Sequence, residues 1–124
     1  MNEVIAILLE KFKGIVPESF YRINTNQVVI YPYLTFNYTS DSVNQHTSSI
    51  TLEIDIFDDM GNDDERLETT LFELQKHFVD DNSRILNDNV FIRFDNIRTN
   101  TIPTMSDTLQ RRNAQIICRV DWRK

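Results

Sequence analysis

The chain has 124 residues, with 19 acidic and 13 basic side chains and a formal net charge of −6. This length suits one domain, which can bury a real core without metal or disulfide support. The acidic balance argues against a nucleic-acid binder held mainly by phosphate neutralisation. Two glycines in the whole chain exclude a glycine-rich phosphate loop or a dinucleotide fingerprint.

Cysteine and hydropathy patterns indicate the compartment. Cys118 is the single cysteine, so it cannot form an internal disulfide, and a lone thiol fits a reducing cytosol. The longest apolar run, Val4–Leu9, is far too short to span a bilayer, and no basic segment precedes it as in a signal peptide. We therefore expect an intracellular protein that has no contact with a membrane.

The N-terminal segment is expected to be a short helix. Ile5, Leu8, Leu9 and Phe12 follow the i, i+3, i+4, i+7 spacing of one helix face. Gly14 is suited to the left-handed position that ends such a helix. About three turns need a packing partner to be stable.

Two strands joined by a long polar loop are predicted next. Val28–Tyr38 is rich in β-branched and aromatic residues, although Pro32 interrupts it and favours an edge position or a bend. Thr39–Ser49 has no hydrophobic period and is predicted to be a flexible hairpin loop. Ser49–Phe57 alternates cleanly between apolar and polar residues, which predicts a strand with one face on the core.

The acidic turn Asp58–Glu65 leads into a second predicted helix. Acidic residues near the start of a helix are favoured by its dipole. The apolar stripe of this helix consists of Leu67, Leu71, Leu74 and Phe78.

The C-terminal third is predicted to hold two more strands. After a polar connection over Val79–Asn89, alternation begins again at Val90. Ile97–Met105 is expected to be irregular because it carries a proline, and Ser106–Gln110 can form a helical turn. The last predicted strand is Gln115–Arg123. Together these segments predict an α+β single domain over residues 1–124 in the order α-β-β-α-β-β. We expect a mostly antiparallel sheet of about four strands with the helices packed on one face.

No catalytic, cofactor-binding or metal site is predicted. The acidic turn invites comparison with a calcium loop, but Met60 occupies a ligand position and the glycine does not have the required spacing to a later glutamate. His46 and His77 have no nucleophile near them in the sequence, and Cys118 lies on the apolar side of its strand. A solvated turn and a small buried cysteine are the simpler interpretations.

Charge and exposed apolar residues favour self-association. Basic residues gather in the C-terminal third and acidic residues gather over residues 55–73, a sign asymmetry that suits head-to-tail contact between subunits. Apolar side chains on the otherwise polar strand faces suggest that another chain covers that face. The long polar loop with His46 is a candidate docking segment. The candidate interface residues are Arg111, Arg112, Arg119, Phe57, Phe91, Asp58, Asp59, Asp63, Asp64 and His46.

The whole chain resembles the tail terminator (tail completion, minor capsid) proteins of long-tailed bacteriophages. The segments that carry the resemblance are the strands YPYLTFNY and SSITLEIDIFDD, the helix NDDERLETTLFELQKHF, and the ending NVFIRFDNIR and DTLQRRNAQIICRVDW. In this family the second strand typically ends in an acidic–aromatic stretch, here Asp55-Ile56-Phe57. An arginine-containing turn, here Arg111-Arg112, leads into a strand with a terminal aromatic, here Trp122.

The resemblance implies a structural, non-enzymatic virion protein made in the host cytoplasm. Terminators form a six-fold ring on the tail tube, stop its growth, and present the docking surface for the head connector. DNA passes through the lumen without specific binding, and no cofactor is implied. A head-side connector or stopper protein of the same neck is the nearest alternative. A small α+β ligand-binding domain or enzyme is the other alternative, since a fold does not fix a function.

Overall fold

The structure is a computed structural model that describes residues 2–44, 46–81, 84–86 and 89–122. Its helices and strands, in chain order, are α1 (Asn2–Lys13), β1 (Ser19–Tyr21), β2 (Tyr33–Asn44), β3 (Thr47–Asp58), α2 (Glu65–Gln75), the π-helical turn η1 (Lys76–Asp81), β4 (Arg84–Leu86), β5 (Val90–Ile102) and β6 (Gln110–Trp122).

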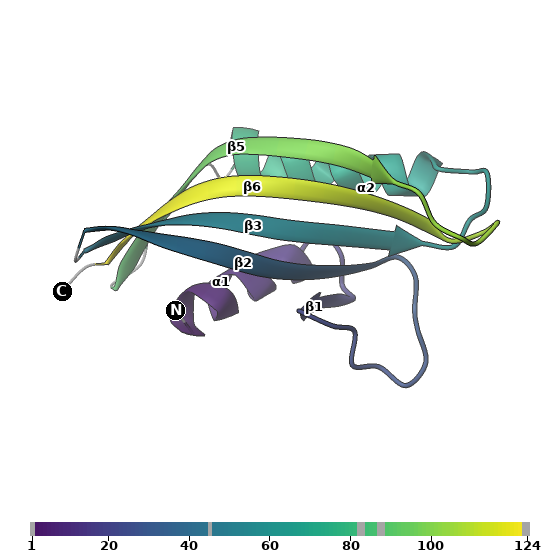
Figure 1. Cartoon of the computed structure of the whole chain (residues 1–124), viewed down its shortest axis with the longest axis horizontal. Helices are drawn as coiled ribbons and strands as arrows, with labels where there is room; N and C mark the ends of the chain where they lie inside the picture. Colours follow the sequence, from purple (N-terminus) through teal and green to yellow (C-terminus); the bar gives the residue numbers. More distant parts are fainter. Residues whose placement is uncertain (1, 45, 82–83, 87–88, 123–124) are drawn as a thin grey trace.

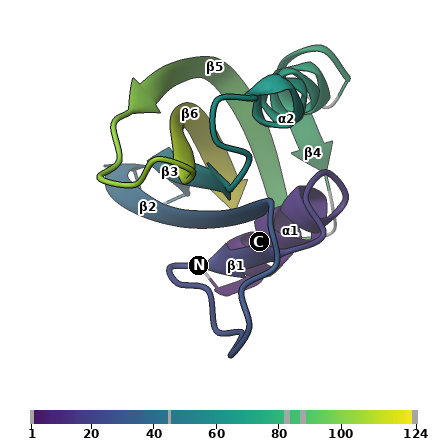
Figure 2. The ribbon, with the colours of Figure 1, turned by 90° about the vertical axis from the view of Figure 1, so that its right-hand side faces the viewer.

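One sheet organises the molecule. Its strand order is β1-β2-β3-β6-β5-β4, with β1 parallel to β2 and every other neighbouring pair antiparallel. The sheet bends around the two helices, which lie on its concave side (Figures 1 and 2). The predicted fold class is therefore wrong. Instead of about four mostly antiparallel strands in the order α-β-β-α-β-β, the described chain is predominantly β, with a mixed sheet of six strands.

The polar hairpin segment is strand rather than loop. β2 continues through Asn44, with Thr39 paired to Thr51 and Asp41 paired to Ser49, so the predicted loop Thr39–Ser49 shrinks to the turn between Asn44 and Thr47. The lack of hydrophobic alternation misled the prediction. Most described side chains beyond Tyr38 on β2 are exposed, so polar residues at those positions lose no core contact.

The C-terminal hairpin is also longer than predicted. β5 runs to Ile102 and β6 begins at Gln110, so the predicted irregular segment Ile97–Met105 and the helical turn Ser106–Gln110 are wrong over most of their length. Twelve residue pairs join the two strands, with one irregularity between Phe94 and Asn96. Cross-strand pairing over this length outweighs the weak strand preference of the Asn-containing segment.

The start of the first predicted strand is also wrong. Val28–Ile30 lies in the exposed connection from β1 to β2, and the strand begins only at Tyr33, after the cis peptide bond between Tyr31 and Pro32. Pro32 thus bounds the strand instead of bending it. The short strands β1 and β4 escape prediction because three residues give no readable period.

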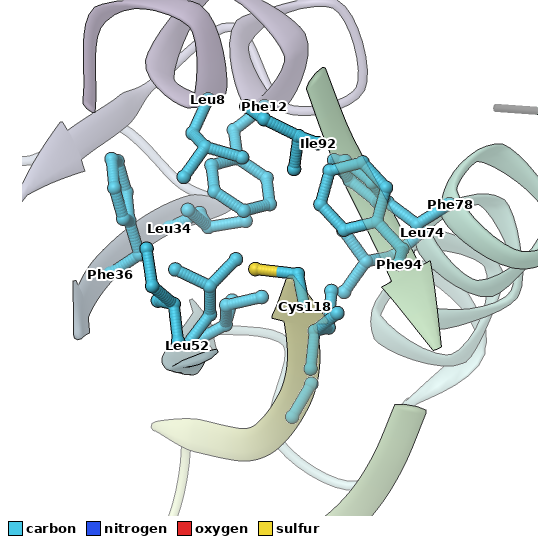
Figure 3. Packing of buried hydrophobic residues seen from close by; sticks show 14 of the residues in the cluster. Leu8, Phe12, Leu34, Phe36, Leu52, Leu74, Phe78, Ile92, Phe94 and Cys118 are labelled. Carbon is cyan, nitrogen blue, oxygen red and sulfur yellow. The ribbon is translucent and has the colours of Figure 1, made fainter. Parts of the chain in front are cut away.

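Both predicted helices are confirmed as helices, and their apolar faces meet in one core. In α1 the predicted Ile5 and Leu9 are only partly buried, and Val4 is buried instead. α1 buries Val4, Leu8 and Phe12, while α2 buries its predicted leucines. The ring of Phe12 lies 4.8 Å from that of Phe36 and 5.2 Å from that of Phe78. In Figure 3 these rings point toward one another from α1, β2 and η1. Fully burying one such side chain contributes about 1.5–3 kcal/mol.

Candidate interaction surface

The convex face of the sheet, away from the helices, carries an ordered polar row. Its centre consists of side chains from β3 and β6, which are neighbours in the sheet. Gln115 Nε2 donates to Glu53 Oε1 at 2.7 Å, and Asn113 Nδ2 donates to Asp55 Oδ1 at 3.2 Å. The same Asp55 oxygen accepts a bond from Arg111 Nε at 3.2 Å. These hydrogen bonds link the side chains of the polar row across the two strands.

An aromatic patch adjoins the polar row. The rings of Tyr33 and Phe57 stack at 4.7 Å, Tyr31 lies 5.7 Å from Tyr33, and the Arg111 guanidinium lies 5.4 Å from the centre of the Phe57 ring. Burial and the neighbouring Tyr31 raise the pKa of Tyr33, so its phenol stays neutral at physiological pH. A half-buried cluster of this composition is typical of protein contact surfaces. We name Tyr31, Tyr33, Phe57 and Arg111 the aromatic patch.

The acidic turn is held by bonds within the chain. Asp58 is fully buried and forms a two-point ion pair with Arg66, in which Nε donates to Oδ2 at 2.8 Å. Burial alone would raise the pKa of Asp58. The hydrogen bonds from Arg66 and from the Asp59 amide outweigh burial and lower the pKa below its usual value. Gln110 Nε2 donates at 3.0 Å to the backbone oxygens of Gly61 and Asp63, which ties this turn to the start of β6.

Arg112 faces the opposite side of the sheet from Arg111. Its Nε donates to Glu68 Oε1 at 3.1 Å, and its Nη2 lies 3.5 Å from Asp64 Oδ2. Both acceptors lie at the start of α2 of the same chain. Part of the basic charge seen in the sequence is thus paired with acidic residues of the same subunit. The charge of Arg112 is therefore not available to a neighbouring subunit.

The predicted interface residues do not form one surface. Phe57 and Arg111 lie in the aromatic patch, while the acidic turn, including exposed Asp59 and Asp63, lies at that same end of the sheet. Arg112 also lies at that end, on the helix side of the sheet. The remaining three lie at the other end of the sheet. His46 is in the β2–β3 turn, with its backbone oxygen accepting from Trp122. Phe91 is opposite Asp121, and Arg119 pairs with Asp121 at 3.6 Å.

Sequence reasoning missed the most exposed apolar segment. The connection between β1 and β2 projects away from the body of the molecule (Figure 1) and exposes Ile23, Val28, Val29 and Ile30, with Val28 75% exposed. We name residues 23–30 the apolar loop. It leads directly into Tyr31 of the aromatic patch, so the two form one continuous surface. The run Val-Val-Ile-Tyr signals apolar character, but its period alone cannot tell a core strand from an exposed loop.

The described residues hold no candidate metal centre, and the cysteine is a packing group. Within the described ranges, no cluster of three or more His, Cys, Asp or Glu residues is arranged to hold a metal ion. Burial, followed by the charge of Asp95, raises the pKa of the Cys118 thiol to about 12, so it stays a neutral packing group, as predicted. None of the described helices has the length and apolar character needed to cross a membrane.

Comparison with known proteins gives the fold alone. One solved structure superposes on this chain with a TM-score of 0.67 and 14% sequence identity, and the match covers 100% of this chain and 96% of that chain. Neither a protein-family model nor a curated protein sequence matches the chain.

Proposed function

We propose that this chain is a structural subunit of a bacteriophage neck that acts as a tail terminator. In this role several copies close into a ring on the tail tube, end its polymerisation, and offer the docking surface for the head connector. The chain carries out no catalysis in this proposal. The mature location is the virion, after assembly in the host cytoplasm.

The observation that carries the proposal is the continuous surface of the apolar loop and the aromatic patch. Four apolar side chains between 44% and 75% exposed within eight residues are costly to leave in water and are typical of a surface that another protein covers. The hydrogen-bonded polar row beside the aromatic patch resembles the polar rim of a contact surface. Together with the whole-chain sequence resemblance, this surface supports an assembly role over a soluble single-copy role.

The net charge is compatible with a DNA passage. A lumen through which DNA slides must not hold phosphates tightly, and a net charge of −6 supplies no strong grip. The exposed carboxylates of Asp59 and Asp63 on the acidic turn are our candidates for lumen or tube contact. The apolar loop is our candidate for docking to the tube protein.

A tube-capping assay tests the proposal. Purified chain is added to polymerising tail tube protein, and the distribution of tube lengths is measured by electron microscopy. The terminator role predicts capped ends and shorter tubes. Ile30→Asp should weaken this capping, whereas Gln27→Asp, which adds the same charge at an exposed polar position of the same loop, should not. Unaltered tube growth, with binding to head connectors only, would identify a connector or stopper instead.

A further inference from the structure

Two long strands of the sheet have open edges. On the side of β2 away from β3, β1 pairs only with Leu34–Phe36, so residues 37–44 have no strand beside them among the described residues. On the side of β5 away from β6, β4 pairs only with Phe91–Arg93, so residues 95–102 of the described sheet are similarly open. An open edge presents unpaired backbone donors and acceptors, which a further strand can satisfy.

These edges face the correct way to join each other. β2 and β3 are antiparallel, as are β3 and β6, and β6 and β5, so β2 and β5 run in opposite directions. Copies related by rotation about an axis roughly along the strands would therefore bring β5 of one copy antiparallel to β2 of the next. Such a contact joins two different surfaces, and this head-to-tail arrangement is the type that closes into rings.

The two open edges also have the same length. Pairing Asn37 with Ile102 at one end places residue 44 opposite residue 95 at the other. In this register β1 of one copy ends where β5 of the next copy ends. Likewise β4 of one copy lies just beyond the β2–β3 turn of its neighbour. The short strands β1 and β4 therefore border the paired segments without overlapping them. We infer that the open edges of β2 and β5 pair between copies of this chain in this register.

The side chains fit the same register. Strand residues point alternately to the two faces of a sheet, so a register that mismatched the faces would place core-side residues on the outer side. Here Ser40 lies opposite Thr99 on the helix side of the sheet, and Asp41 lies opposite Arg98 on the convex side. Asp41 and Arg98 are both exposed, and neither has an ion-pair partner in the described part of its own chain. The pairing places Asp41 of one copy beside Arg98 of the next copy, so each side chain gains a partner of opposite charge.

The register also gives a tilt suited to closure. Across one copy, Asn37 lies level with Arg98, whereas in the proposed contact it meets Ile102, four residues farther along β5. Four residues correspond to about 13 Å along the strand, and the four long strands are about 19 Å wide. The resulting strand tilt of about 35° lies at the lower end of the range found in closed barrels.

This inference rests on the proposed ring, and charge reversal tests it. Asp41→Arg or Arg98→Asp alone should raise the protein concentration needed for assembly by about three- to tenfold, because attraction becomes repulsion at every contact. The double variant Asp41→Arg/Arg98→Asp should restore wild-type assembly. Glu73→Arg, at an exposed position of α2, is the matched control and should leave assembly unchanged.

Cysteine cross-linking tests the register itself. Single variants Asp41→Cys and Arg98→Cys are mixed, and separately Ser40→Cys and Thr99→Cys, so that every disulfide must join two copies. Neighbouring antiparallel pairs alternate between Cα separations of about 4.5 and 5.5 Å, and both distances allow a disulfide. Thr39→Cys with Arg98→Cys is two residues out of register and should link poorly. Cys118 is buried and does not compete.

Each combination of results decides between the two proposals. In-register links together with closed rings support both. Rings without in-register links overturn the edge pairing and leave the terminator role standing. In-register links in open filaments support the edge pairing and count against the ring. Monomers without links at every concentration overturn the edge pairing and also exclude a ring that forms without a tube.

Discussion

The ion pair between Asp58 and Arg66 should be strongly asymmetric in its response to mutation. The Asp58 side chain is 0% exposed, whereas that of Arg66 is 45% exposed. Removing Asp58 leaves an arginine that water can solvate. Removing Arg66 leaves a buried carboxylate with only the Asp59 amide as a partner, which is the costly case.

The cost of Arg66→Ala can be worked out from proton uptake. A buried carboxylate without its partner can become neutral by binding a proton. This costs about 1.4 kcal/mol for each pH unit above the ordinary pKa of the group, near 3.9. This protonation cost is the upper limit on the cost of stranding the carboxylate, and at pH 7 it is about 4 kcal/mol. We therefore expect Arg66→Ala to lower the free energy of unfolding by about 2–4 kcal/mol. At pH 5 the limit falls to about 1.5 kcal/mol. Asp58→Asn should cost less at pH 7, about 1–3 kcal/mol, since it leaves no buried charge.

The sign of the wild-type pH dependence follows from the lowered pKa of Asp58. This group stabilises the fold fully above its unfolded pKa, and that stabilisation is lost as the pH falls through the lower folded pKa. In Arg66→Ala the burial of the carboxyl dominates and raises its pKa, so the deficit relative to wild type should shrink as the pH falls from 7 to 5.

Urea unfolding followed by far-ultraviolet circular dichroism at pH 7 and pH 5 measures these differences. Arg119→Ala is the control, because its pair with Asp121 is long and exposed and should contribute less than about 0.5 kcal/mol. The reasoning is refuted if Arg66→Ala costs no more than Asp58→Asn at pH 7, or if its cost is independent of pH.

Three further predictions concern the core, the apolar loop and the thiol. Leu71→Ala should cost about 2–5 kcal/mol in urea unfolding, whereas Phe72→Ala, at a 61% exposed neighbour, should cost far less. Equal costs would contradict the helix orientation. Val28→Asp should leave the melting temperature unchanged while weakening the capping of tail tubes; a large fall in melting temperature would show that the loop is packed. Cys118 should resist thiol reagents until urea unfolds the protein, and rapid labelling of the folded chain would contradict its burial.

Local patterns predicted the elements whose residues contact the core. The leucines of α2 and the alternation in β3 are amphipathic signals strong enough to be read without a structure. The same method failed where the sheet extends beyond the core. Thr99 and Thr101 lie in strand β5 but are exposed, so their positions show no hydrophobic period in the sequence.

The candidate surface was harder to predict because it depends on pairing between distant strands. Arg111 and Phe57 are 54 positions apart, and only the β3–β6 ladder places them opposite each other. The change of face between Arg111 and Arg112 follows from strand alternation, since one residue points to each side of the sheet. Sequence spacing grouped the two arginines as one basic cluster, whereas the strand divides them.

The most direct test of the terminator role is the solution mass over a series of protein and salt concentrations, with negative-stain images of the same fractions, alone and with tail tubes. The account predicts closed rings of uniform size, either free or seated on tube ends. A monomer under all conditions, including in the presence of tubes, would contradict it.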